Sequence, residues 1–169
     1  INLLSAHDLA FVEEPIFALD PLKDWAQVAS GSPVPIAAGE NITSARQFAD
    51  MVGQGGLGVV QPDVAKWGGI SGAMEVGRDA LDRGAQVMLH YMGTALGLAA
   101  SLHVMAALKC DGRVELDANP NPLRTDLGDM ELRPTAGRLP VPDGAGLGFE
   151  PDPEALRRFC VAETTVTRN

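Results

Sequence analysis

Short apolar runs of strand length recur along the chain, and each ends on an acidic residue or a histidine. They follow one another at intervals of 23 to 27 residues, about the length of one strand, one helix and two loops. The runs and their last residues are LAFVE at Glu13, PIAAGE at Glu40, GVVQPD at Asp63, QVMLH at His90 and RVE at Glu115. This repeat indicates parallel strands joined by crossover helices. The ends of such strands share one edge of the sheet, so we expect the five polar residues to converge on one site.

The stretches between these runs have the apolar spacing of helices. Apolar residues recur at three- and four-residue steps over 21–29, 45–52, 70–84 and 94–109. Thr43 or Ser44 is the candidate N-cap of the second helix. Residues 1–8 resemble the end of a helix, because the apolar pattern begins there without a start signal. The predicted strands are 34–38, 57–61, 86–89 and 114–117, after a first strand that ends at Glu13.

The pattern changes after residue 118. Residues 119–169 are rich in proline and have little periodicity apart from one short helical stretch near 153–160. We therefore predict two parts: a partial βα barrel over 1–118, and an extended C-terminal tail over 119–169. Such a tail either packs across a folded body or acts as a linker.

Composition excludes several classes of protein. The chain has 169 residues and a formal net charge of −9, with no cluster of Lys and Arg of the kind that a nucleic-acid-binding face requires. It contains no apolar stretch of transmembrane length, so we expect no membrane partner. Cys110 and Cys160 have no metal-type spacing and are expected to be reduced thiols in the cytoplasm.

Carboxylates at neighbouring strand ends favour a magnesium site. Glu13 and Glu40 are hard oxygen ligands of the kind that Mg²⁺ prefers, with water and substrate oxygens completing the coordination. Glu14 follows Glu13 directly and must point to the other side of the strand, so the residues alone leave the choice between the two open. A third carboxylate ligand would be expected, and no suitable one precedes Glu13.

Asp63 and His90 end consecutive strands and are candidates for a general-base pair. A carboxylate that accepts a proton from one imidazole nitrogen fixes the tautomer and raises the basicity of the other nitrogen. The plainer alternative is a capped core histidine and a turn-forming aspartate.

Glu115, at the end of the fifth run, is a candidate hydrogen-bond donor to substrate if it is held protonated, and Asp117 competes with it for that role. Lys66 either touches substrate or is an ordinary surface loop residue.

Five segments in this order carry a resemblance to a known family: EEP, AAGEN, QPDVAKWGGI, LHYMGTALGLAASLH and VELDANPNPLR. The chain resembles, over essentially its whole length, the C-terminal part of enolase-superfamily proteins of the mandelate racemase subgroup. The resemblance implies an α/β fold, the C-terminal part of a (β/α)7β TIM-like barrel, incomplete without the N-terminal capping domain and the first strands. A complete barrel takes about 250 residues.

The same resemblance implies roles for individual residues. Glu13 and Glu40 would be two of the Mg²⁺ ligands, Asp63 and His90 the acid/base dyad, and Glu115 a contact to the substrate carboxylate. The first metal ligand and a lysine acid/base would lie outside this sequence, and the tail would return to the capping domain.

These features together predict a Mg²⁺-dependent enzyme that removes the proton α to a carboxylate. We expect a sugar-acid dehydratase first, and a racemase or epimerase of a 2-hydroxy acid second. The partner would be a small-molecule carboxylate, and the full-length protein a homo-oligomer. These residues alone would be inactive. A non-catalytic barrel fragment or interaction module is the alternative of another class.

Overall fold

A five-stranded parallel sheet organises the chain, with its strands side by side in sequence order. The computed structural model describes residues 1–128 and 134–166. The strands are β1 (Val12–Glu13), β2 (Ile36–Ala38), β3 (Val59–Val60), β4 (Gln86–Leu89) and β5 (Arg113–Val114). Every neighbouring pair is parallel. All five strands therefore present their carboxyl ends at the same edge, as the repeat of apolar runs predicts.

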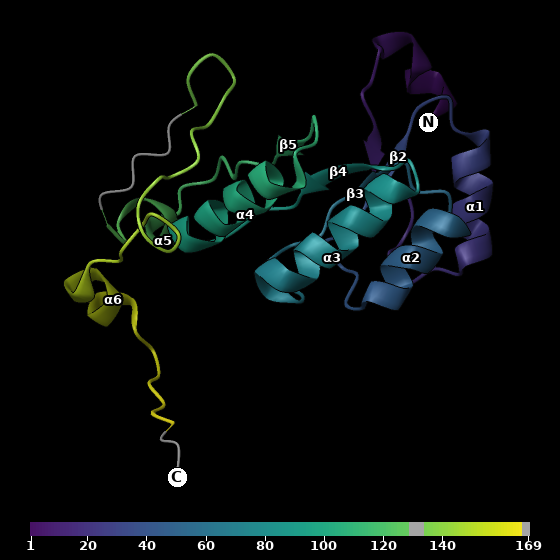
Figure 1. The fold of residues 1–169 in the computed structure, drawn as a ribbon. Helices are drawn as coiled ribbons and strands as arrows, with labels where there is room; N and C mark the ends of the chain where they lie inside the picture. The colour runs from purple at the N-terminus through teal and green to yellow at the C-terminus, as the bar shows by residue number, and fades with distance from the viewer. Residues whose placement is uncertain (129–133, 167–169) are drawn as a thin grey trace.

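The crossover helices follow the strands in the expected order and run along the sheet in Figure 1. They are α1 (Leu22–Gly31), α2 (Ala45–Gly53), α3 (Gly69–Asp82) and α4 (Ala95–Leu108). Ser44, rather than Thr43, caps α2 by accepting a hydrogen bond from the Gln47 amide at 3.2 Å, and Thr94 caps α4 in the same way. Each of these two helices thus begins directly after a strand-end loop, and its N-cap fixes the end of that loop.

The sheet has two faces with different roles. The helix-side face carries the main core, which includes Trp25, Ile36, Ala38, Phe48, Val60, Val87, Leu89 and Val104. The opposite face carries a smaller cluster of Phe11, Ala37, Val59 and Met88. Because side chains alternate along a strand, Ala38 packs against the helices and Ala37 faces the other way. That second face corresponds to the interior of a βα barrel.

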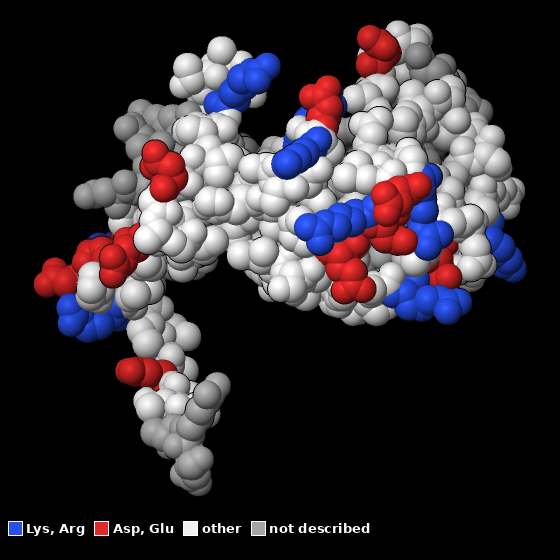
Figure 2. All heavy atoms as spheres, viewed as in Figure 1, with Lys and Arg blue, Asp and Glu red and all other residues white. Residues whose placement is uncertain are grey.

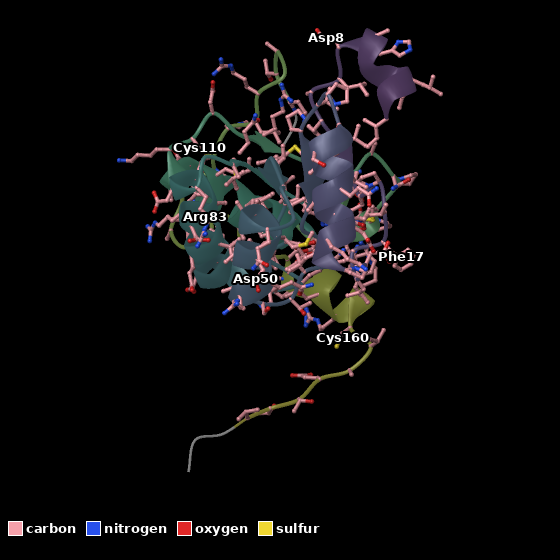
Figure 3. The ribbon with its side chains drawn as sticks, turned by 90° about the vertical axis from the view of Figure 1, so that its right-hand side faces the viewer. Asp8, Phe17, Asp50, Arg83, Cys110 and Cys160 are labelled. Carbon is pink, nitrogen blue, oxygen red and sulfur yellow. The ribbon has the colours of Figure 1, made fainter. Side chains whose placement is uncertain are left out.

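Charged side chains gather on the outer face of the helices. Over α2 and α3, Figure 2 shows acidic and basic side chains interspersed. Two helical pairs belong to this face, Arg46 with Asp50 and Arg83 with Asp79, each at 2.7 Å and four residues apart. Asp50 and Arg83 lie on the same side in Figure 3. Such exposed pairs contribute little to stability, so this surface is a solvated one rather than a site.

The described part of the tail, residues 119–128 and 134–166, contains two short helices, of which the sequence predicts one. α6 (Pro153–Phe159) matches the predicted segment near 153–160 and is capped by Asp152, whereas α5 (Pro122–Thr125) is too short for periodicity to reveal. The His103 ring contacts the Leu147 carbonyl at 3.2 Å and so joins α4 to the tail. Packing of the tail toward a capping domain stays a prediction.

Smaller differences from the predicted elements have local causes. Residues Asn2–His7 form a 3-10 helix, η1, rather than the end of an α-helix, and it stops where Asp8 adopts a left-handed conformation (φ 50°). β5 is shorter than the predicted 114–117, although the Glu115 amide still donates to the Leu89 carbonyl at 3.3 Å.

Cys110 and Cys160 are both free thiols, as expected, and lie far apart in Figure 3. Within residues 1–128 and 134–166, no helix has the length and apolar character to cross a membrane.

Gly39, which follows β2, is expected to be essential for the close approach of β2 and β3. A Cβ atom there would lie 2.4 Å from the carbonyl carbon of Gln61, so the two backbones would have to separate. Gly39→Ala should therefore lower the free energy of unfolding by about 1–3 kcal/mol, measured as a lower urea midpoint. The matched control is Gly31→Ala, where nothing lies within 4 Å of the added Cβ. Equal midpoints for the two variants would rule out this role for Gly39.

Candidate active site

Four of the five predicted strand-end residues meet around one imidazole ring. His90 follows β4 and its side chain is 4% exposed. Its Nδ1 lies 2.8 Å from Asp63 Oδ2, and its Nε2 lies 2.6 Å from Glu40 Oε2 and 3.7 Å from Glu115 Oε2. The residues are up to 75 positions apart in sequence, and parallel strand pairing alone brings them together.

Asp63 fixes one side of the His90 ring. Its Oδ1 accepts the Ala65 amide at 2.7 Å, which holds the carboxylate while Oδ2 accepts from His90 Nδ1. Burial raises the pKa of Asp63, but hydrogen bonds from His90 and Ala65 outweigh burial, so that the pKa lies below its ordinary value. Asp63 is therefore an ionised acceptor that orients the imidazole.

His90 is surrounded by carboxylates. Burial lowers its pKa, but the hydrogen bond to Asp63 and the charges of Glu115 and Glu40 outweigh burial and raise the pKa above its ordinary value. Ionised carboxylates only accept hydrogen bonds, so both ring nitrogens carry protons in this arrangement. Nε2 is the nitrogen on the side of Glu40 and Glu115, and it is the one able to exchange a proton with a ligand there.

Glu40, directly after Gly39, is shared by several donors. Its Oε2 accepts from Lys66 Nζ at 2.8 Å as well as facing His90, and its Oε1 accepts from Asn41 Nδ2 at 3.1 Å. The hydrogen bond from Lys66 is the main cause that holds the pKa of Glu40 below its ordinary value. Lys66 thus contacts a residue of the cluster, and its contact with substrate, which the sequence leaves open, stays a prediction.

Glu115 and Asp117 have separate environments, and only one of them faces His90. Glu115 Oε2 accepts the Tyr91 amide at 3.2 Å and lies on the His90 side. Asp117 instead accepts from the backbone and side chain of Asn119, both at 2.9 Å, and lies near Arg124. Of the two, Glu115 is the one that joins the cluster around His90.

Glu13 and Glu14 occupy different positions beside Glu40. Glu13 is in register with Ala37, so its side chain belongs to the face that carries Ala37 and Val59, the barrel interior, and it is exposed there. Glu14 has a positive φ of 37°, and both of its carboxylate oxygens accept from Asn41 Nδ2, at 3.2 and 3.0 Å. Among the described residues, no hydrogen bond links Glu13, the fifth predicted site residue, to the cluster around His90.

The carboxylates suit a magnesium ion as part of its coordination shell. Glu40 carries one oxygen toward Asn41 and one toward Lys66, and Glu13 lies on the interior face of the adjacent strand. Mg²⁺ is commonly held by one or two carboxylates with water and substrate oxygens. Among the described residues, no group of three or more His, Cys, Asp and Glu is arranged to hold a metal, so these carboxylates supply only part of a site.

Gln61 and Asn41 are polar residues next to the candidate site in the chain that the sequence pattern does not reveal. Gln61 is 1% exposed, and neither side-chain amide atom has a hydrogen-bond partner within 1–128 and 134–166. It stands two residues before Asp63, in the QPD motif, and its backbone amide donates to the Ala38 carbonyl at the end of β2. Asn41 links Glu14 to Glu40. Their position beside a strand-end acid was the only signal in the sequence.

Comparison with known families identifies the family of this chain. The sequence model of the enolase C-terminal domain-like family matches residues 1–155. The chain belongs to this family. This match confirms the resemblance. It also confirms the fold class expected from the sequence, the C-terminal part of a TIM-like barrel.

Relatives of this enolase-family chain include enzymes named for sugar-acid chemistry. D-galactarolactone cycloisomerase of Agrobacterium fabrum is 32% identical over 155 residues, covering 87% of this chain and 41% of that protein. Arabinonate dehydratase of Saccharolobus solfataricus is 34% identical over 139 residues, covering 82% and 37%. A crystal structure of a mandelate racemase/muconate lactonizing enzyme from Bordetella bronchiseptica is 41% identical with a TM-score of 0.81, covering 90% and 43%. The chain thus spans about two fifths of the length of the relatives it matches.

Tyr91, the only tyrosine in this enolase-family chain, gives a direct test of the loop beside His90. Its hydroxyl donates to the carbonyl oxygens of Gly93 at 2.8 Å and Thr94 at 3.1 Å, and burial raises its pKa to about 12. The phenol should titrate near 12 in the native chain and near 10 in urea, followed by tyrosinate absorbance. The neutral phenol makes its full contribution to the free energy of unfolding below about pH 10, and this contribution is lost as the pH rises toward about 12. Tyr91→Phe should abolish the signal, and a native midpoint near 10 would refute the buried position.

Proposed function

We propose that the full-length protein is a Mg²⁺-dependent enzyme that removes the proton α to the carboxylate of a sugar acid and then eliminates water. The observation that carries this proposal is His90, a buried imidazole held by Asp63 through Nδ1 with Nε2 facing Glu40 and Glu115. The similarity to an arabinonate dehydratase and a D-galactarolactone cycloisomerase supports the substrate class.

His90 is the proposed acid/base. In its neutral form, Nδ1–H is committed to Asp63 and the lone pair of Nε2 faces the ligand side of the site. Nε2 takes the α-proton, and Asp63 stabilises the imidazolium that forms. The α C–H bond and the β C–O bond break, a C=C bond forms, and the hydroxyl leaves as water with a proton returned from Nε2.

Glu13 and Glu40 are the proposed metal ligands of this chain. When bound, Mg²⁺ would stabilise the negative charge that develops on the substrate carboxylate as the α-proton leaves. Lys66 and Asn41 donate to Glu40 and hold that side chain ionised and oriented toward the interior face. Glu115, whose Oε2 accepts from the Tyr91 amide, would donate a hydrogen bond to the substrate carboxylate when it carries a proton.

A racemase or epimerase of a 2-hydroxy acid is the second candidate. The observation that favours it is the 41% identity to the structure of a mandelate racemase/muconate lactonizing enzyme. The same proton abstraction at His90 begins both reactions, and they differ in whether a β-hydroxyl leaves. Homo-oligomerisation and a cytoplasmic location stay predictions.

Removal of either member of the dyad should abolish proton abstraction. His90→Asn and Asp63→Asn are each expected to slow exchange of the substrate α-proton with D₂O by about 10²- to 10⁴-fold, because general acid–base catalysis contributes that much. The measurement is proton NMR of the full-length protein with a panel of sugar acids, and product identity separates dehydration from racemisation.

His103→Asn is the matched control for that experiment. His103 lies on α4 and contacts the Leu147 carbonyl of the tail, away from the cluster, so this variant should exchange the α-proton at the wild-type rate. Wild-type protein that binds Mg²⁺ yet exchanges no α-proton with any sugar acid would favour the non-catalytic alternative.

Glu13 and Glu14 form a matched pair that tests the metal assignment. Glu13 lies on the interior face with Ala37, whereas Glu14 is already engaged by Asn41. Glu13→Gln should weaken Mg²⁺ binding by about tenfold or more, equivalent to about 1.4 kcal/mol, in calorimetric titrations of the full-length protein. Glu14→Gln should leave the affinity close to wild type. The reverse order of the two variants would assign the ligand to Glu14.

A further inference from the structure

A second polar cluster lies in the loop that follows β5, after Glu115 in the chain. It consists of Asp117, Asn119, Asn121 and Arg124, which we call the Asp117 clamp. The Asp117 side chain is 3% exposed, unusually buried for an acid in a loop. It accepts from Asn119 at 2.9 Å and faces Arg124 at 3.4 Å. Such burial is tolerated because the charge is paired and hydrogen-bonded.

Arg124 closes the loop on itself. It stands in α5 and reaches back to the start of the loop, where its guanidinium donates to the carbonyl oxygens of Asp117 and of Asn119, the latter at 2.8 Å. Two carbonyls and one carboxylate thus share a single planar donor. This geometry suits the fixed fork of arginine and does not suit the point charge of lysine.

The clamp also reaches the loop that carries His90. Asn121 Nδ2 donates to the Gly93 carbonyl at 2.8 Å, the same oxygen that accepts from the Tyr91 hydroxyl. The Tyr91 amide in turn donates to Glu115 Oε2 at 3.2 Å. A closed set of contacts therefore runs from Glu115 through Tyr91 and Gly93 to Asn121 and back along the loop.

β5 needs such support because the strand is short and lies at the edge of the described sheet. It has two residues and pairs with β4 alone. The Glu115 side chain is 34% exposed, so packing does little to orient it. Hydrogen bonds from neighbouring loops are then the means by which Glu115 is kept near His90.

We propose that Asp117 and Arg124 are positioning residues that set the geometry between Glu115 and His90, by locking the loop after β5 onto the loop after β4. They act through Asn121, whose Nδ2 donates to Asp117 Oδ2 at 3.4 Å and to the Gly93 carbonyl, and they are not themselves in the cluster around His90. The catalytic consequence rests on the function proposed above, whereas the structural consequence does not. Displacement of a catalytic group by about 1 Å costs about 100-fold in rate.

The test compares Arg124→Gln and Asn121→Ala with Arg158→Gln in the full-length protein. Arg158 pairs with Asp126 at 3.3 Å in the tail. Arg158→Gln is the matched control because it also removes one arginine, at an exposed position. Arg124→Gln and Asn121→Ala should lower kcat by about 10- to 100-fold and enlarge the deuterium isotope effect on kcat with α-deuterated substrate. Amide exchange at Tyr91 should become faster in both variants, with little change in the urea midpoint. Arg124→Lys should fail to restore kcat.

Each outcome decides the proposal. Wild-type kcat and an unchanged Tyr91 amide in Arg124→Gln would overturn it, as would a loss of activity explained by a matching fraction of unfolded protein. If the wild-type protein turns over no sugar acid, the proposed function fails, and Tyr91 amide exchange alone then decides whether the clamp holds the loop. Faster exchange in Arg124→Gln than in Arg158→Gln supports the clamp, and equal exchange refutes it.

Discussion

Parallel pairing of five short strands is the constraint on which the rest of the structure depends. The strands have two to four residues each, so few backbone hydrogen bonds define the sheet. Their order is kept by the helix-side core, in which Trp25, Val60 and Leu89 are fully buried. Each such apolar side chain contributes about 1.5–3 kcal/mol by burial. The register that results places Glu40, Asp63, His90 and Glu115 at one edge, and no contact among them could form without it.

The interior face of the sheet imposes a second requirement, close approach of backbones. Gly39 lets β2 run against the backbone of Gln61, and the next residue is Glu40. A side chain at Gly39 would push the two backbones apart directly before Glu40, whose Oε2 lies 2.6 Å from His90 Nε2. The glycine in the AAGEN segment is therefore explained by packing between two strands, and its effect on the site follows from that packing.

The sequence predicts that these residues lie together because the polar residues coincide with the period of the apolar runs. Asp63 and His90 could be assigned to one edge since both end apolar runs of the repeat, and their hydrogen bond follows from adjacent parallel strands. Lys66 lies outside that pattern, because a loop residue can point anywhere until the loop is folded. α5 was missed for a related reason: four residues hold no helical period, and α5 is defined by Pro122 and the Asn121 cap. Glu13 and Glu14 are adjacent in the sequence, so only the pairing of Glu13 with Ala37 shows which of the two side chains lies on the interior face.

The burial of Asp63 and His90 is not explained by a gain in stability. Asp63 and His90 are 5% and 4% exposed, and removing two charged groups from water costs several kcal/mol per ion before their attraction offsets that cost. Apolar residues of similar volume would often fold as well or better at such positions. The cost is reduced here by the Ala65 amide on one side and by Glu40 with Lys66 on the other. An imidazole that carries its protons among carboxylates, at a stability cost, is the arrangement that the proton transfer proposed for His90 requires.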